Sequence, residues 1–183
     1  MTGVQTCALP ILNVANFEGQ GLRVHIWAAD LDCPLPPFWP IHNHTFDIVS
    51  YVSAGIISNA IYQVEPANAG TATNRVYLVE YMHNISRLRA TKDLVRVVNT
   101  SESKAVRGEI YRVHRGRFHA STSKAGFSCT VVCTVNNLEP VPLVLGDLGG
   151  APAYENARRR CESSIVERLL VEARKESVGS GGL

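Results

Sequence analysis

Apolar and polar residues alternate in short runs along the first 135 residues of the chain. In residues 22–28, Leu-Arg-Val-His-Ile-Trp-Ala, every second side chain is apolar, which is the period of a strand with one buried face. Further β-rich runs lie at residues 44–55, 56–64, 75–82, 94–99, 105–113 and 127–135, and the polar residues 100–104 predict a turn. Several short strands joined by turns predict an all-β sandwich or barrel.

His25 lies on the polar side of residues 22–28. Alternate side chains of a strand point to opposite faces. If the apolar face of this strand is turned towards the core, its polar face is turned away from the core. We therefore expect His25 to be a surface or hydrogen-bonded histidine and not a metal ligand. Residues 30–40 contain four prolines and predict an irregular loop, because proline cannot donate to a β-ladder.

The pattern changes towards the C-terminus. Residues 138–152, which include Gly149-Gly150, predict a loop. Residues 154–177 have helical composition, and their apolar stripe consists of Ile165, Val166, Leu169, Leu170 and Ala173. This spacing predicts an α-helix within residues 151–177 that packs on the β-domain or on a dimer mate. Residues 178–183 predict a disordered tail.

The composition is typical of one soluble globular domain. The chain has 183 residues with 45 % apolar and 19 % charged side chains and a net charge of +2, so no strong excess of charge points to a nucleic-acid partner. One dense basic run, residues 158–160, is interpreted as the solvated face of a helix. No apolar run reaches the length of a membrane span. The cysteines show no paired spacing, which favours a reducing, cytoplasmic location.

Residues 1–11, Met-Thr-Gly-Val-Gln-Thr-Cys-Ala-Leu-Pro-Ile, resemble the translation of a common sequencing-library adapter. We expect this segment to be foreign to the native protein and residues 12–150 to form the β-domain. The same interpretation implies that the native chain began upstream, so that a strand or a signal peptide is missing here.

Two histidines one residue apart, His42 and His44, provide the clearest candidate chemistry. In a strand, residues i and i+2 face the same side, so both imidazoles are expected to point into one space while Asn43 points away. Neutral imidazole is the commonest metal ligand among side chains. One more ligand from a distant strand would complete a metal site.

A second stretch, residues 108–123, supplies that ligand. Together the two stretches resemble the paired motifs of the cupin superfamily, which they match at His42, His44, Gly55, Gly108, Gly116 and His119. His114 and Ser123 stand where the second motif has proline and asparagine. The resemblance covers about residues 39–123. It implies a double-stranded β-helix, which is a small jelly-roll barrel, with a divalent metal on His42, His44 and His119.

The chain departs from this family pattern at one ligand. Ile48 occupies the position of the usual glutamate, and Asp47 precedes it by one residue. On strict alternation, Asp47 faces away from the histidines unless a bulge shifts the strand. Asp47 is therefore a minority candidate ligand, and its alternative role is hydrogen bonding beside the site. A three-histidine site without a carboxylate resembles the cysteine dioxygenase and thiol dioxygenase branch of cupins, in which the metal is Fe(II).

These features predict a non-haem iron dioxygenase that acts on a small thiol or another chelating substrate. The ligand type alone does not choose among iron, zinc, manganese and nickel. Two alternatives therefore stay open: a metal-dependent isomerase, lyase or hydrolase of a small polar metabolite, and a non-catalytic cupin that binds a small molecule. The family habit also implies a homodimer.

Candidate residues beyond the metal ligands are weakly defined. A tyrosine, Tyr77 or Tyr111, and an arginine, Arg75, Arg112 or Arg117, could orient an anionic substrate, although arginine is also a common residue on strand surfaces. His83 is expected in an exposed turn and His114 at the rim of the site. Cys129 and Cys133 share one face of residues 127–135 and are expected to pack as apolar side chains.

Overall fold

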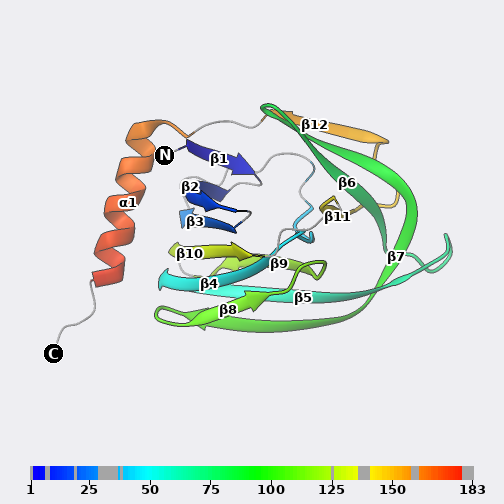
Figure 1. The fold of residues 1–183 in the computed structure, drawn as a ribbon. Coiled ribbons are helices and arrows are strands. Elements are labelled where there is room, and N and C mark those ends of the chain that lie inside the picture. The colour runs from blue at the N-terminus through cyan, green and yellow to red at the C-terminus, as the bar shows by residue number, and fades with distance from the viewer. Residues whose placement is uncertain are drawn as a thin grey trace.

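The computed structural model describes residues 2–6, 9–18, 20–28, 37, 39–124, 126–135, 141–157 and 161–178, with side chains from residue 10 onward. Two antiparallel sheets form a sandwich, and an α-helix near the C-terminus lies beside the first sheet, on the side away from β6, β7 and β11 (Figure 1). The proline-rich residues 29–36, the basic run 158–160 and the tail residues 179–183 lie outside the described part of the chain.

Sheet A has the strand order β1-β2-β3-β10-β4-β8. Its strands are β1 (Thr2–Thr6), β2 (Leu9–Phe17), β3 (Gln20–Ala28), β10 (Phe127–Val135), β4 (Asp47–Ala54) and β8 (Ile110–Val113). Strand β1 and the start of β2 belong to the adapter-like segment, and β1 pairs with β2 at the edge of the sheet.

Sheet B has the order β11-β6-β7-β5-β9, and β12 also pairs with β7. Its strands are β11 (Leu143–Gly146), β6 (Asn74–Met82), β7 (Ile85–Val106), β5 (Ile56–Pro66), β9 (Phe118–Ser123) and β12 (Ala153–Ala157). Apolar side chains of the two sheets meet between them, as where Val52 of β4 packs with Ile57 of β5 and Ala105 of β7. The predicted β-rich class and the strands at residues 22–28, 56–64, 75–82 and 127–135 are confirmed.

The predicted turn at residues 100–104 is wrong, because these residues continue strand β7. Thr100 pairs with Tyr62 of β5, and Lys104 pairs with Ser58. A β-ladder is held by backbone hydrogen bonds, so solvent-facing polar side chains extend a strand as readily as apolar ones do. Polarity alone therefore gave no information about where the strand ends.

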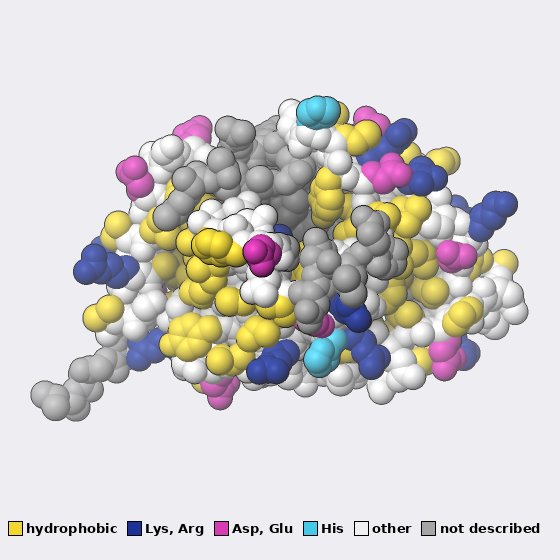
Figure 2. Space-filling view, in the orientation of Figure 1, with side chains coloured by type: hydrophobic (Ala, Val, Ile, Leu, Met, Phe, Trp, Pro, Cys, Tyr) yellow, Lys and Arg dark blue, Asp and Glu magenta, His cyan; other side chains and the backbone are white. Residues whose placement is uncertain are grey.

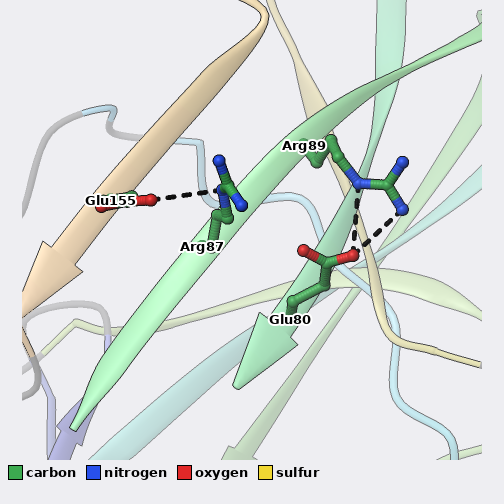
Figure 3. A network of polar contacts seen from close by, with 4 residues as sticks. All are labelled: Glu80, Arg87, Arg89 and Glu155. Carbon is green, nitrogen blue, oxygen red and sulfur yellow. Dashed lines mark hydrogen bonds and ion pairs between the residues drawn. The ribbon is translucent and has the colours of Figure 1, made fainter. Parts of the chain in front are cut away.

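The C-terminal part also differs from the prediction. Residues 143–146 form strand β11 instead of a loop, and residues 153–157 form strand β12 instead of the start of the helix. In β12, Tyr154 and Asn156 are half-buried and their neighbours are exposed, which is the period of a strand. An ion pair between Arg87 and Glu155 links β7 to β12, and Arg89 pairs with Glu80 of β6 (Figure 3).

Helix α1 (Ser163–Val178) begins later than predicted and covers the outer face of sheet A. Its Leu169 and Ala173 are buried in one cluster with Leu12, Ile26 and Cys129, and Val24 and Ala28 of β3 pack against the same cluster. The apolar side of β3 therefore faces the helix. The polar side, which carries His25, faces the interior of the sandwich. The expected surface position of His25 is wrong because the sequence does not reveal which face of β3 the helix covers.

Gly55 lies in the sharp connection between β4 and β5. Its φ is +74°, a conformation that residues with a Cβ rarely adopt. A Cβ at this position would also collide with the backbone carbonyl of Phe127 and the side chain of Ser128. Glycine is therefore required here by both conformation and space.

Large apolar side chains are exposed at scattered positions of the surface, such as Phe17, Ile110 and Val178. On the face drawn in Figure 2, acidic and basic side chains are interspersed with apolar ones. Among the described residues, no helix has the length and apolar character needed to cross a membrane.

Candidate metal centre

The two sequence motifs meet through the backbone. His42 pairs with His119 of β9, so that each amide donates to the carbonyl of the other, at 3.0 and 2.8 Å. His42 also forms a bridge with Val144 of β11. The short segment around His42 thus connects β9 to β11, the two outer strands in the order of sheet B.

Neighbouring hydrogen bonds fix this segment in place. The Leu145 amide donates to the Ile41 carbonyl, and the Asn43 amide donates to the Leu143 carbonyl. The Asn43 side-chain oxygen accepts a hydrogen bond of 2.7 Å from the Leu143 amide. Although residues 43–46 are not part of a regular strand, His42 and His44 lie close together and Asn43 is bound to β11. The two imidazoles therefore lie together as expected, although no continuous strand places them, but Asn43 also lines their cavity.

The three imidazoles His42, His44 and His119 form a compact cluster. One ring nitrogen from each lies within 4.8 Å of the others, and Nε2 of His44 is 3.0 Å from Nε2 of His119. Two imidazole nitrogens bound to one zinc ion in tetrahedral geometry, at about 2.1 Å each, would be about 3.4 Å apart. The cluster could therefore hold a metal ion.

Hydrogen bonds orient two of the rings. Nδ1 of His42 lies 2.8 Å from the Pro40 carbonyl, and Nδ1 of His119 lies 3.1 Å from Oδ1 of Asn59. The Ser121 hydroxyl donates to the same Asn59 oxygen at 2.9 Å. A carbonyl acceptor requires a proton on each Nδ1, so both Nε2 atoms keep a lone pair for a metal.

Asn59 was not identified from the sequence. It lies on β5 between Ile57 and Ile61 and is 4 % exposed. Within residues 56–64, Asn59 falls at a position where strand alternation places a core side chain. A polar residue in the middle of an apolar face was therefore the signal that could have found it, because a buried amide needs hydrogen-bond partners.

Burial keeps the histidines of the cluster neutral at pH 7. It lowers the pKa of His119 to about 3, with His42 and His25 as further causes. The pKa of His42 is also lowered by burial, and that of His44 falls well below its usual value through burial and the neighbouring histidines. Neutral imidazoles are the form that binds metal.

The cluster lines a cavity of about 280 Å³ between the two sheets, which is large enough for a small metabolite. Ile48, in the position of the usual glutamate, contributes an apolar wall. No Asp, Glu, Lys or Arg is found among the described residues that line this cavity. A divalent cation on three neutral imidazoles would therefore keep its full positive charge.

Asp47 lies outside the cluster. Its carboxylate accepts a hydrogen bond of 2.9 Å from the Arg115 amide and lies 3.5 Å from Nδ1 of His114. The Asp47 side chain therefore stabilises the turn before β9, and the structure does not support its minority role as a ligand. His114 is exposed at this turn, and His83 is exposed in the turn between β6 and β7.

The two tyrosine candidates have different positions. Tyr111 lines the cavity, whereas Tyr77 is fully buried against Trp39 and Tyr154 and donates to the Ala151 carbonyl. Burial raises the pKa of each phenol. Of these two candidates, Tyr111 is therefore the one that can reach a ligand in the cavity, and it stays protonated at pH 7.

None of the three arginine candidates lines the cavity. Arg112 and Arg117 are exposed, and Arg75 has a buried Nε without a hydrogen-bond partner among the described residues. Arg112 directly follows Tyr111 on β8, and because strand residues alternate, the inward position of Tyr111 places Arg112 outward. The expected arginine contact with an anionic substrate is therefore not supported.

Cys129, Cys133 and His25 also differ in whether they face the cavity. Cys129 is buried beneath helix α1 and Cys133 is exposed, so neither faces the histidine cluster. His25 lines the cavity together with the three clustered histidines. Burial, followed by Arg23 and His42, lowers its pKa to about 3.

No protein-family model matches the chain, and no curated protein shows significant similarity to it.

Proposed function

We propose that the chain is a metal-dependent enzyme of cupin type, and specifically a non-haem iron dioxygenase that acts on a small thiol or another chelating substrate. His42, His44 and His119 hold the metal. The observation that carries the proposal is the convergence of three imidazole nitrogens within 4.8 Å of one another at a cavity between the two sheets. The motif resemblance to cupins supports the same assignment.

The charge of the cavity supports an anionic chelating substrate. Three neutral ligands leave a divalent cation uncompensated, and the cavity wall supplies no acidic side chain among its described residues. In a low-dielectric site this charge is stabilised by an anionic ligand. A thiolate or a carboxylate of the substrate provides that charge directly. An iron ion supplies the redox chemistry with dioxygen, and the open positions of a three-histidine site leave room for substrate.

The protein side chains bind and orient the substrate. The cavity of about 280 Å³ admits only a small molecule, and aromatic residues such as Trp27 and Trp39 form part of its wall. The phenol of Tyr111 remains protonated and can donate a hydrogen bond to the bound substrate. The hydroxyl of the neighbouring Ser121 donates to Asn59. Asn59 also accepts a hydrogen bond from His119, so Tyr111 and the metal ligand His119 contact one polar network.

Metal analysis of protein purified without oxygen tests the proposal first. We expect about one equivalent of a transition metal, with iron the most abundant. Protein that contains no transition metal, and takes up none on reconstitution, would contradict every enzyme assignment made here. It would leave a non-catalytic cupin that binds a small molecule.

Oxygen consumption then separates the reaction classes. The iron-loaded protein is expected to consume oxygen with cysteine, cysteamine or 3-mercaptopropionate. A protein that binds metal firmly but consumes no oxygen with any thiol would instead support an isomerase, lyase or hydrolase. Such an enzyme could use the metal as a Lewis acid and Tyr111 as a proton donor.

A further inference from the structure

We infer that His25 is the residue that hydrogen-bonds the non-protein ligand of the metal, an anion bound beside the histidine cluster. The inference rests on the proposed metal site and adds a fourth imidazole that orients the ligand without coordinating the metal. The three clustered histidines bind the metal but do not show which side chain binds the anion. The inference assigns that role to His25.

The position of His25 is set by the inner face of sheet A. On β3 it pairs across the ladder with Thr130 of β10. His119, in contrast, belongs to β9 of sheet B, so the two imidazoles reach the same cavity from opposite sheets. His25 acts electrostatically on both His44 and His119. It is not part of the group whose ligand nitrogens lie within 4.8 Å of one another.

The imidazole of His25 has unused hydrogen-bonding capacity. Its Nε2 is buried and has no partner among the described residues. Buried polar atoms in native proteins are normally paired, because an unmade hydrogen bond destabilises the folded state. A ligand in the cavity would supply the missing partner.

Charge decides which ligand suits His25. The imidazole is neutral at pH 7, since its pKa is about 3, and a nearby divalent cation favours the neutral form further. A neutral imidazole donates one hydrogen bond. Because the metal site carries excess positive charge, the acceptor is an anion. Tyr111 also lines the cavity and is a further donor that can reach the same bound ligand.

Binding of azide to the cobalt-substituted protein tests this assignment. Cobalt(II) reports its coordination through visible absorption, and azide is a small anion that accepts hydrogen bonds. We expect His25→Phe to bind cobalt as the wild type does but to bind azide about 10- to 100-fold more weakly, which is the range for the loss of one hydrogen bond to a charged group. His25→Gln retains a donor and is expected to bind azide within a few fold of the wild type.

Two further variants complete the design. His114→Phe makes the same chemical change at an exposed histidine outside the cavity, and its azide affinity should equal that of the wild type. His25→Leu repeats the test with a smaller side chain if the phenylalanine variant does not fold, as judged by circular dichroism.

The remaining outcomes overturn the inference in distinguishable ways. Equal azide binding by the wild type and the apolar His25 variants would show that His25 makes no contact with the anion. Equal weakening in His25→Gln and His25→Phe would indicate a packing effect. Loss of cobalt, or an altered cobalt spectrum without azide, would make His25 a fourth ligand. Failure of the wild type itself to bind cobalt would refute the proposed metal site and the inference together.

Discussion

His42 and His119 form a reciprocal backbone pair in which each amide donates to the carbonyl of the other residue, at 3.0 and 2.8 Å. This pairing places the two imidazole rings 4.7 Å apart. The candidate metal centre is therefore built on a β-bridge between distant parts of the chain. Because backbone hydrogen bonds hold both ligands, the site is expected to be preorganised before metal binds.

Replacing His119 by alanine should abolish metal binding, because two imidazoles remain and one of the oriented nitrogens is lost. Metal content after purification and reconstitution checks this. His114→Ala removes an exposed histidine of the same segment and should leave the metal content unchanged. Full metal occupancy in His119→Ala would exclude His119 as a ligand.

Asn59→Ala should weaken metal binding about 10- to 100-fold, the usual range for the loss of a hydrogen bond to a metal ligand. The Asn59 oxygen fixes the proton on Nδ1 of His119 and thereby orients Nε2. A competition titration against a chelator measures the affinity. Asn99→Ala is the matched control, because Asn99 is exposed on β7. An equal affinity in both variants would show that Asn59 does not orient His119.

The stability of the metal-free protein should fall as pH drops below about 6.5. An unfolded histidine titrates near this pH, whereas the folded His25 and His119 have a pKa of about 3. Between pH 6.5 and 3, the unfolded chain therefore binds more protons than the folded chain, and the free energy of unfolding decreases with decreasing pH. Each such histidine contributes up to about 1.4 kcal/mol per pH unit.

Urea denaturation at pH 7.5, 6.5 and 5.5 measures this dependence. His25→Phe should lower the slope by the contribution of one histidine. Identical slopes for His25→Phe and the wild type would mean that His25 binds protons equally in the folded and the unfolded protein at these pH values.

Gly55→Ala should destabilise the fold more than Gly116→Ala does. Both glycines have a φ near +74°, at 74° and 73°, but a Cβ at Gly55 collides with Phe127 and Ser128 whereas one at Gly116 meets no atom within 4 Å. Backbone strain costs about 1–2 kcal/mol in each variant, and the collision adds to this cost only at Gly55. Thermal unfolding compares the two, and equal losses would contradict the collision.

Leu169→Ala should destabilise the protein by about 2–5 kcal/mol, as is usual for a truncated core leucine. Leu169 is fully buried between helix α1 and sheet A. Val171→Ala lies on the exposed side of the same helix and should change stability by less than about 1 kcal/mol. Similar effects of the two substitutions would show that the helix does not cover the sheet in solution.

The β-rich class, several strand positions and the pairing of His42 and His44 with His119 could be predicted from the sequence. The partnership with His119 follows from the resemblance to the paired cupin motifs. The strands follow from local information, because a two-residue period marks a strand. The same rule failed at residues 100–104, where polar side chains continue a strand because the ladder with β5 is made by the backbone. It also failed at residues 153–157, whose strand depends on the available edge of β7.

The sequence by itself determined that this chain is a β-protein in which His42 and His44 lie close together, since alternation and residue spacing are properties of the chain alone. Tertiary structure decided which side of each strand became the interior. Helix α1 covers the apolar side of β3, so His25 faces the cavity. The segment at His42 joins β9 to β11, which brings His119 into the cluster, while Asp47 at the start of β4 accepts a hydrogen bond from the turn before β9. These outcomes depend on contacts between distant segments, and no local pattern encodes them.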